Sequence, residues 1–459
     1  MNESYQLSLF IFRRDLRVDD NTGLLEALRS SKQVIPCFIF DPRQIGSANE
    51  YRSTNAIQFM IESLQDLEQQ LKQRKGSLYL FEGIAEKVLE KLIKKYSIDA
   101  VFCNRDYTPF SIKRDEAIKK ICLHHEIEFI QSQDLLLTQP EEVMTQGGTP
   151  YAKFTPFFKK ASLKKIATPI KCSSGNFFNK SIKESAGTDL YKKILKKKNS
   201  SLNIPGGRMH GLSIIKSLKK FKDYAKIRNA PSIATTLLSA HNKFGTLSIR
   251  EVYHAIQKQL GKNHLLIQQL FWRDFFTHVA YNSPFVFGQP FQERYTNLSW
   301  NKSYKNFESW CQGKTGFPIV DAGMRQLNET GFMHNRVRMI VASFLTKDLH
   351  INWLWGEKYF AQQLEDYDPA VNNGNWQWCA STGCDAQPYF RIFNPWLQQK
   401  KFDPDCTYIK TWIPELKKVK PSLIHTWFKK TSPSIKNYPR PILDHSQEAA
   451  LAKKMYRKA

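Results

Sequence analysis

The sequence lacks several features that would place it in other protein classes. None of its apolar runs approaches the roughly 18 residues that a membrane-spanning helix needs. The apolar stretch at 7–12 leads directly into Arg13 and Arg14 without a preceding basic segment, which argues against a secretory signal. The eight cysteines include no C-x-x-C pair and none at zinc spacing to a histidine. We therefore expect a cytoplasmic chain without a metal site, a disulfide scaffold or a membrane partner.

Phosphate-binding glycine loops are also absent. No G-x-G-x-x-G follows the first apolar run, and no G-x-x-x-x-G-K-[ST] occurs, so the sequence predicts no phosphate-cradling loop of either kind. Tryptophan is missing from the first 271 residues, whereas all ten indoles fall between Trp272 and Trp427. This difference in aromatic content predicts two domains.

The first part of the chain alternates between two kinds of pattern. Helical spacing is clearest from Ile57 to Leu71, where apolar residues recur at i, i+3, i+4 and i+7. Alternating strands and helices predict a doubly wound parallel sheet, with ligands at the carboxyl ends of its strands. The expected strands are 7–12, 34–40, 78–81, 100–104 and 129–137. We predict an α/β domain at 1–140, a Lys/Ser/Asn-rich linker at 141–205 and an all-α domain at 206–459.

The net charge of +26 favours a polyanionic partner, and nucleic acid more than an acidic membrane. The distribution of charge does not locate the binding site. Residues 153–200 and 397–459 together hold 20 of the 26 net positive charges, as expected of a solvated linker and tail.

Residues 333–345 have helical spacing on two faces. The expected core face consists of Met333, Val337, Ile340 and Phe344. The second face carries an amide, a guanidinium and a thioether, on Asn335, Arg338 and Met339, and ends at Ala342. Taken alone, this second face is more simply interpreted as an ordinary polar helix surface.

Residues 366–378 combine two acids, a proline, amides and two indoles, which predicts a turn. Either this turn holds a planar ligand, or it is buried around core tryptophans. If the two elements meet, Asp366 can neutralise Arg338. Trp376 and Trp378 are two residues apart and are expected to point in different directions. Residues 234–248 add hydroxyls suited to phosphate, although such runs are usually helix caps.

Together these segments resemble the photolyase/cryptochrome flavoprotein family over nearly the whole chain, and most closely the bacterial class I members. The resemblance implies an α/β antenna domain, a long linker and a helical domain that holds FAD. The motifs that carry it are 12–21, 272–275, 313–327, 334–339, 372–378 and 389–395.

The same resemblance implies the positions around the cofactor. Leu237 departs from the arginine of many bacterial members, and Gln269 stands where many of them carry glutamate. The implied flavin contacts are Tyr224, Thr235, Thr236, Leu237, Leu238, Ser239, Gln269, Arg273, Arg338, Asp366, Tyr367, Asp368 and Asn372.

Resemblance also assigns residues to electron transfer and to DNA. Trp300, Trp353 and Trp376 match the indoles that photoreduce the flavin, and Asn335, Met339 and Asn372 complete the implied catalytic set. The residues that match positions at the flipped lesion or the DNA backbone are Trp272, Asn335, Met339, Trp378, Arg228, Arg336 and Arg391.

The implied activity is light-driven repair, in which reduced FAD donates an electron to a flipped pyrimidine dimer. Members that repair the 6-4 photoproduct carry His where this chain has Asn335 and Met339, and here neither side chain titrates. We therefore expect the cyclobutane dimer as substrate. The alternatives are repair of the 6-4 photoproduct, a signalling cryptochrome, and a nucleic-acid-binding module without catalysis. Signalling members often carry Asp or Cys where Asn372 stands, and a long extension that we do not find after residue 416.

The antenna chromophore stays open at this point. Folate-binding members carry Asn and Glu where this chain has Phe110 and Ser111, which argues against folate. A deazaflavin, a second flavin or no chromophore are the remaining alternatives. The expected partner is ultraviolet-damaged DNA, and we expect a monomer.

Overall fold

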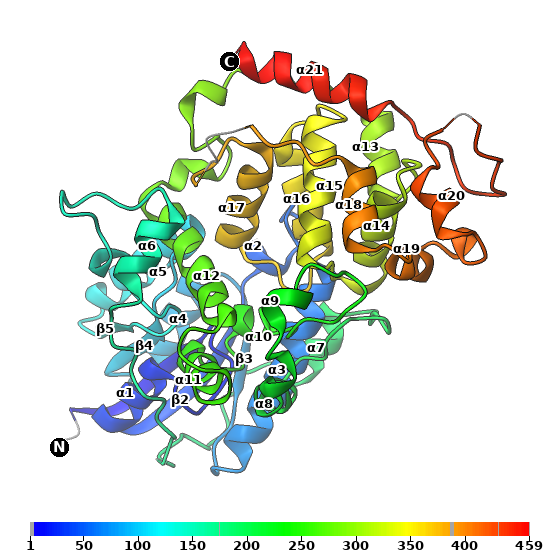
Figure 1. Ribbon diagram of the computed structural model, residues 1–459. Helices are drawn as coiled ribbons and strands as arrows, with labels where there is room; N and C mark the ends of the chain where they lie inside the picture. The colour runs from blue at the N-terminus through cyan, green and yellow to red at the C-terminus, as the bar shows by residue number, and fades with distance from the viewer. Residues whose placement is uncertain (1–3, 174, 386–389, 430, 459) are drawn as a thin grey trace. The chain divides into compact units, whose positions relative to one another are not determined.

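The computed structural model describes residues 4–173, 175–385, 390–429 and 431–458 (Figure 1). The chain forms two compact units that interleave along the sequence. Unit 1 comprises residues 1–200, 204–222 and 238–284, and unit 2 comprises 201–203, 223–237 and 285–459. The domain boundaries expected near residues 140 and 205 stay a prediction.

Unit 1 contains a five-stranded, fully parallel sheet in the order β3-β2-β1-β4-β5. The predicted parallel α/β fold is therefore confirmed, with Ile11 of β1 opposite Cys37 of β2 on one side and Cys103 of β4 on the other. The strands are β1 Tyr5–Phe12, β2 Ser31–Phe40, β3 Tyr79–Glu82, β4 Ala100–Asn104 and β5 Glu128–Ser132.

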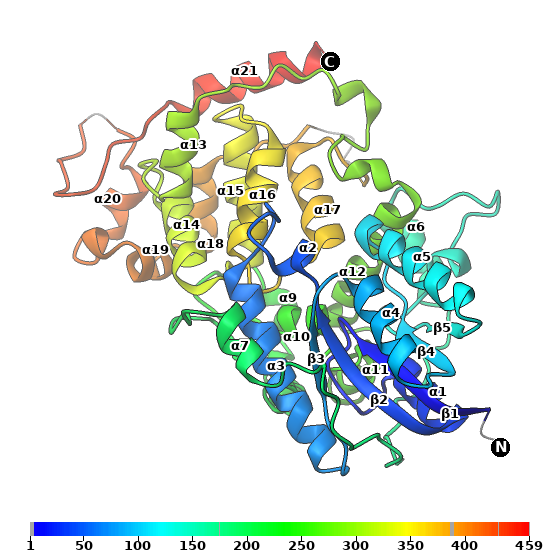
Figure 2. The ribbon, with the colours of Figure 1, turned by 180° about the vertical axis from the view of Figure 1, so that it is seen from behind.

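Helices cover both faces of this sheet. Leu9 and Ile11 share an apolar cluster with α4 (Ala85–Lys95) and α5 (Pro109–His124), which lie side by side in Figure 2. Phe10 points to the opposite face, where α1 (Thr22–Ser30) packs against the sheet. The remaining helices of unit 1 are α2 Pro42–Ile45, α3 Thr54–Lys72, η1 Pro140–Glu142, α6 Phe154–Ala161, α7 Asp189–Ile194, α8 Arg208–Lys216, η2 Leu218–Phe221, α10 Ser239–Phe244, α11 Ile249–Leu260 and α12 Leu265–Asn282.

The fifth strand is shorter than predicted, because it ends at Ser132 rather than near residue 137. The apolar run continues, but its backbone bonds to side chains of α12 instead of to a strand. Asp274 accepts hydrogen bonds from the amides of Leu137 and Thr138, at 2.8 and 3.1 Å. An apolar run alone does not distinguish a strand from a buried loop of this kind.

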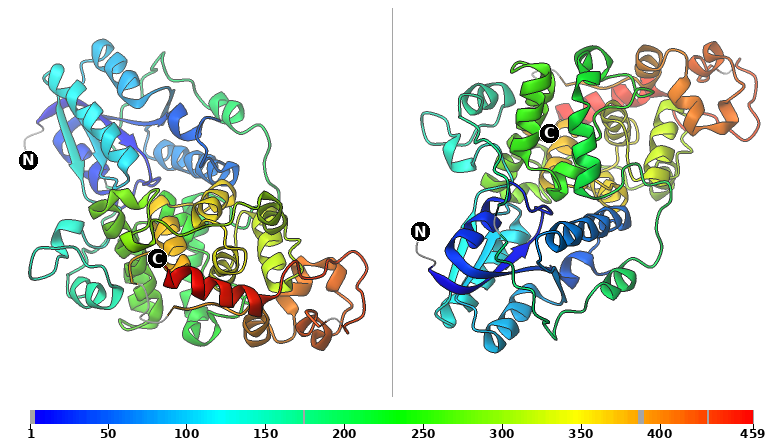
Figure 3. Two further views of the ribbon diagram at one scale, coloured as in Figure 1. Left: turned by 90° about the horizontal axis from the view of Figure 1, so that it is seen from above. Right: turned by 90° about the horizontal axis from the view of Figure 1, so that it is seen from below.

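Unit 2 is helical throughout its described residues, as predicted. Its centre is α15, which packs against α14, α16, α17, α18 and α21 (Figures 1 and 3). The expected core stripe of Met333, Val337, Ile340 and Phe344 is at most 1 % exposed. The helices are α9 Tyr224–Ile227, η3 Pro284–Val286, η4 Glu293–Tyr295, α13 Tyr304–Cys311, α14 Pro318–Thr330, α15 Asn335–Lys347, α16 Trp353–Gln363, α17 Pro369–Ala380, α18 Pro395–Phe402, α19 Thr407–Trp412, η5 Pro414–Leu416, α20 Pro421–His425 and α21 His445–Arg457.

No helix among the described residues of either unit combines the length and the apolar character that crossing a bilayer requires.

Candidate functional site

The N-terminal part of α15 presents a cation beside a buried acid in unit 2. His334 caps the helix, since its Nδ1 accepts a hydrogen bond from the Arg336 amide at 3.1 Å. One turn later, Arg338 donates from Nε to the Met333 carbonyl at 2.7 Å. Its Nη2 lies 3.0 Å from Oδ2 of Asp366, a residue that is 8 % exposed. The pairing that the sequence allowed for these two residues therefore forms.

Residues 369–380 form a helix, so the predicted turn over 366–378 is wrong. Asp368 caps α17 by accepting from the amides of Ala370 and Val371, and Pro369 occupies the first turn, where a missing N–H costs nothing. The two buried asparagines of this helix donate to residues outside it. Asn372 donates to the carbonyl of Glu357 at 3.0 Å, and Asn373 donates to that of Val286 at 2.9 Å.

The two indoles of α17 point in different directions, as predicted. Trp376 is 2 % exposed, whereas Trp378 is only partly buried. The buried indole lies against Gly356, where a Cβ atom would come within 2.2 Å of the Trp376 ring. No other residue type fits there without moving that indole.

The three indoles proposed for electron transfer belong to unit 2. Trp353 and Trp376 are part of one buried apolar cluster, and the partly buried Trp300 packs against this cluster. Trp310, which the sequence did not single out, lies edge-on to Trp376 with ring centroids 6.1 Å apart.

Of the three arginines proposed for DNA contact, Arg336 lies close enough to both Arg228 and Arg391 in unit 2 to be repelled by their charges. The pKa of Arg336 is lowered by its burial and by the charges of Arg228 and Arg391. Arg336 is held in place by Asn229, whose Oδ1 accepts from Nη2 at 2.8 Å, and by the ring of Phe402. A cluster of like charges that repel one another is suited to binding a polyanion.

The two residues proposed to face the lesion are adjacent on α15. The Nδ2 of Asn335 lies 3.8 Å from Sδ of Met339, and Asn335 is exposed. Neither side chain titrates near neutral pH, so this part of the helix surface offers an amide and a thioether but no acid.

The hydroxyl-rich segment contains a strained backbone position. Leu237 has a φ of +56°, in the left-handed region that a leucine rarely adopts. Thr235 and Thr236 precede it with partly buried side chains, and Leu238 and Ser239 follow. Strain of this kind is concentrated at ligand-binding segments. Tyr224 opens α9, and Tyr367 stands between Asp366 and Asp368; both side chains are partly buried.

The remaining proposed residues lie on α12 of unit 1. Trp272 stacks on Phe154 of α6, with ring centroids 3.7 Å apart and an interplanar angle of 7°. Arg273 donates from Nη1 to the carbonyl of Leu135 at 2.8 Å, and Gln269 lies one turn earlier with a partly buried side chain. The sequence did not indicate Phe154, because the contact joins residues more than 100 positions apart.

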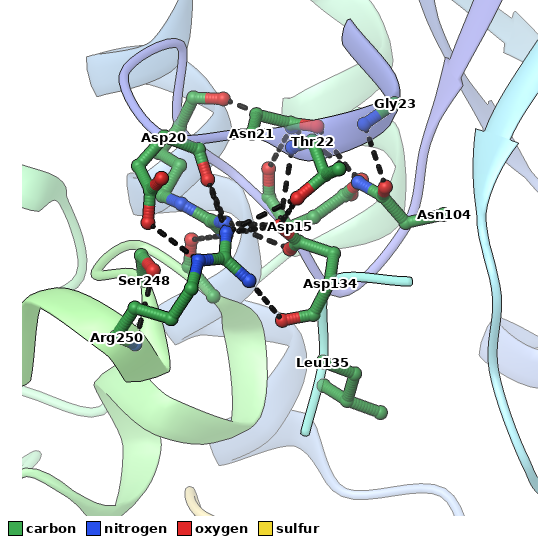
Figure 4. Close-up of polar contacts among 12 residues, drawn as sticks. Asp15, Asp20, Asn21, Thr22, Gly23, Asn104, Asp134, Leu135, Ser248 and Arg250 are labelled. Carbon is green, nitrogen blue, oxygen red and sulfur yellow. Dashed lines mark hydrogen bonds and ion pairs between the residues drawn. The ribbon is translucent and has the colours of Figure 1, made fainter. Parts of the chain in front are cut away.

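The loop that receives Arg273 is fixed by a buried network in unit 1 (Figure 4). The Asp134 carboxylate accepts from Arg17 at 2.7 Å, from Arg250 at 2.8 Å and from the hydroxyl of Thr22 at 3.0 Å. The charges of Arg17 and Arg250 hold the pKa of Asp134 well below its usual range, although burial opposes them. Leu135 follows directly, so the network sets the carbonyl that Arg273 binds.

Polar and cationic groups also gather near the carboxyl ends of β1, β2 and β4 in unit 1. The ring of Phe110 lies 5.3 Å from the Arg43 guanidinium and 5.9 Å from that of Arg114. Asp115 accepts from Nη1 of Arg13 at 2.7 Å and from Nε of Arg114 at 3.0 Å. The Nη2 atoms of Arg13 and Arg114 are buried and have no hydrogen-bond partner among the described residues. Ser111 donates to Asp106 at 3.0 Å.

Metal ligation has no candidate site in the described ranges, where no three His, Cys, Asp or Glu side chains come together as a ligand set. All eight cysteines are buried and unbonded to one another. Tyr389, the first residue of the motif 389–395, lies outside the described residues.

Two protein-family models match the chain, one in its N-terminal part and one in its C-terminal part. Residues 8–174 match the family model described as DNA photolyase, and residues 266–458 match the FAD-binding domain of DNA photolyase. A deoxyribodipyrimidine photo-lyase of Alkalihalophilus pseudofirmus is 36% identical over 98% of this chain and 97% of its own length. The chain belongs to the photolyase/cryptochrome family.

Solved structures give the same result. An archaeal photolyase from Sulfolobus tokodaii, described as holding two FAD molecules, has a TM-score of 0.90 and 43% identity over 99% of this chain and all of its own. A class III photolyase from Agrobacterium tumefaciens has a TM-score of 0.91 at 33% identity, covering 100% of this chain and 98% of its own. A Synechocystis cryptochrome reaches 0.89 at 29% identity, with coverage of 99% and 100%. As a member of this family, the chain binds FAD as its cofactor and carries out photo-lyase chemistry in DNA repair.

Proposed function

We propose that the protein repairs cyclobutane pyrimidine dimers in DNA, and that Asn335 and Met339 face the lesion. The observation that carries this proposal is their adjacency one turn apart on α15, where Asn335 is exposed and Met339 is partly buried, beside Arg338. Opening a cyclobutane ring by adding and then recovering one electron moves no hydroxyl group, so a proton donor is not needed. The 6-4 reaction moves a hydroxyl and gains from a titrating group, which neither Asn335 nor Met339 supplies.

The residues of unit 2 suit the cofactor. The Arg338 cation, held between Asp366 and the Met333 carbonyl, is fixed where it can stabilise negative charge on a flavin ring. The buried Asn372, anchored to the Glu357 carbonyl, offers a neutral amide whose position cannot vary. Thr235 and Thr236 supply hydroxyls for the phosphates. Bound FAD would supply the light-driven electron, and these residues would bind and orient the cofactor.

In the same proposal, Trp376 is the indole nearest the cofactor, and Trp353 and Trp300 follow towards the surface. Exposure supports Trp300 as the outermost of the three, since Trp376 and Trp353 are each 2 % exposed and Trp300 is partly buried. The order of Trp376 and Trp353 rests on the family resemblance. Trp378 of unit 2 and Trp272 of unit 1 are each proposed to stack on a base of the damaged DNA, because proteins commonly hold unpaired bases by stacking them on aromatic side chains. Arg228, Arg336 and Arg391 are proposed to grip the DNA backbone.

The test uses two oligonucleotides, one with a single cyclobutane thymine dimer and one with a single 6-4 photoproduct. We expect blue light and reduced enzyme to restore only the first. Asn335→His is the matched variant, and it should lower dimer repair without conferring 6-4 repair. Restoration of only the 6-4 photoproduct contradicts the assignment, and failure to restore either favours the cryptochrome alternative.

We also propose that unit 1 binds a second flavin near the carboxyl ends of its strands. Two buried guanidinium N–H groups, on Arg13 and Arg114, have no partner among the described residues and suit phosphate oxygens. The 43% identical Sulfolobus protein is described with two FAD molecules. We expect two flavins released per chain on heating, and one from Arg114→Leu. One flavin per wild-type chain contradicts this proposal.

A further inference from the structure

Lys347, the last residue of α15, is buried, and no carboxylate among the described residues pairs with it. Its side chain is 2 % exposed, and Nζ donates to Oγ of Ser381 at 2.7 Å and to the carbonyl of Arg391 at 2.6 Å. The neighbouring Asp348 is paired instead with His445. Nζ also lies 4.7 Å from the centroid of the Phe390 ring.

Burying an ammonium group is unfavourable, and an apolar side chain of similar size would fill this space at lower cost. That cost is visible in the pKa of Lys347, which burial lowers to about 7. Among the described residues, its hydrogen-bond acceptors are one hydroxyl and one backbone carbonyl. A lysine at this position is therefore explained by what its two hydrogen bonds connect, rather than by stability.

Three segments of unit 2 meet at this side chain. The first is α15, which carries Arg336 and Met339 towards its other end. The second is the end of α17, where Ser381 adopts a φ of +64° three residues after Trp378. The third is the segment 390–394, which we call the strap and which contains Arg391. Lys347 therefore joins the elements that carry five of the residues proposed to face the lesion or contact the DNA backbone, namely Asn335, Arg336, Met339, Trp378 and Arg391.

The strap has a second tie to the same helix. The amide of Phe393 donates to Oγ of Ser343 at 3.3 Å, and Ser343 lies one helical turn before Lys347. On its other side, the ring of Phe390 packs on Tyr456 of α21, with centroids 4.4 Å apart. These ties hold the backbone on both sides of Arg391, whose side chain is exposed.

We propose that Lys347 is a positioning residue for DNA binding, which fixes the backbone of Arg391 so that its guanidinium reaches a phosphate without ordering the strap anew. The inference rests on the proposed role of Arg391 as a backbone contact. Binding that must first order a segment is weaker than binding to a segment already held in place, so loss of Lys347 removes the benefit of Arg391 even though the guanidinium remains.

The experiment measures the affinity of the FAD-loaded protein for a duplex with one thymine dimer, across a range of salt concentrations. We expect Arg391→Ala to weaken binding about tenfold and to reduce the slope of log affinity against log salt by about one, as for one lost phosphate contact. Lys347→Met should reproduce most of both changes. The double variant should bind no more weakly than Arg391→Ala alone, because both substitutions remove the same contact.

The control pairs Lys347→Met with Arg228→Ala, for which the two losses should add. If Lys347→Met does not retain FAD, Ser343→Ala removes the second tie of the strap without burying or removing a charge, and it should show the same non-additivity with Arg391→Ala. A salt slope unchanged in Arg391→Ala overturns the proposed DNA contact itself. The positioning role alone is overturned if the losses of Lys347→Met or Ser343→Ala add to that of Arg391→Ala. It is also overturned if Lys347→Met and Ser343→Ala bind DNA as tightly as wild type.

Discussion

The Arg338 guanidinium and the Asp366 carboxylate form an ion pair in which both carboxylate oxygens lie within 3.2 Å of Nη2. The acid is almost fully buried, while the cation keeps about a quarter of its side chain exposed. The pair joins α15 to the segment that precedes α17, so it fixes the relation between the two helices that carry most of the proposed flavin contacts of unit 2. A charge held in this way needs no rearrangement when a cofactor binds.

Asp366→Asn tests this relationship. The substitution keeps an acceptor of similar shape but removes the charge opposite Arg338, and hydrogen bonds to charged groups contribute about 1.5–3 kcal/mol. We therefore expect FAD to be retained at least tenfold less tightly, as measured by bound flavin per chain after extensive dilution. Asp405→Asn, at an exposed position on the same unit, is the control and should retain flavin normally. Equal retention by both variants means that Arg338 does not need this acid to hold the cofactor.

Trp376→Phe tests the proposed order of electron transfer. Phenylalanine fills most of the buried space, but its ring is much harder to oxidise than an indole. We expect photoreduction of oxidised FAD to stop, while enzyme reduced chemically beforehand still repairs dimers under blue light. The measurement is the absorption spectrum before and after illumination with a thiol reductant. Trp427→Phe is the matched control, since Trp427 is 1 % exposed in the same cluster; normal photoreduction in Trp376→Phe would remove it from the path.

The sequence predicts the parallel sheet well because strands buried on both faces must be continuously apolar, and such runs are visible locally. The same reasoning fails where tertiary bonds replace local preference. The run expected to extend β5 to residue 137 bonds to Asp274 instead, and the side-chain amide of Asn372 on α17 donates to the carbonyl of Glu357 on α16. In both places the deciding partner lies far away in the sequence.

The candidate site divides in the same way. The opposite orientations of Trp376 and Trp378 follow from spacing, and the pairing of Arg338 with Asp366 follows from charge once their elements meet. By contrast, Phe154 behind Trp272 and Lys347 behind Arg391 have no local signal, because each acts through contacts with residues far away in the sequence. The residue roles taken from family resemblance stay predictions until variants are measured.

Arg336→Ala tests the cluster of arginines. Because Arg228 and Arg391 already repel the Arg336 cation, a phosphate placed among them relieves repulsion as well as forming contacts. We expect affinity for dimer-containing duplex to fall about tenfold or more at low salt, with the slope of log affinity against log salt reduced by about one. Lys417→Ala, an exposed position in the basic C-terminal segment, should change neither quantity as much. A slope that does not change in Arg336→Ala excludes a phosphate contact at that residue.

Asp274→Asn tests how burial of an acid on α12 affects stability. Burial raises the pKa of Asp274 to about 7, although the Arg273 charge and two backbone N–H groups favour the ionised form. The folded protein therefore keeps a proton that the unfolded chain releases near pH 4, and the stability this confers is lost as pH rises through 7. Asparagine can still accept from the amides of Leu137 and Thr138 but does not titrate. We therefore expect the difference in thermal midpoint, variant minus wild type, to become more positive as the pH is raised from 5 to 7.5. The corresponding change in the difference in unfolding free energy is about 2–3 kcal/mol. Thr277→Val, a non-titrating change on the same helix, should show no such trend, and a pH-independent difference for Asp274→Asn would mean that Asp274 stays ionised in the folded protein.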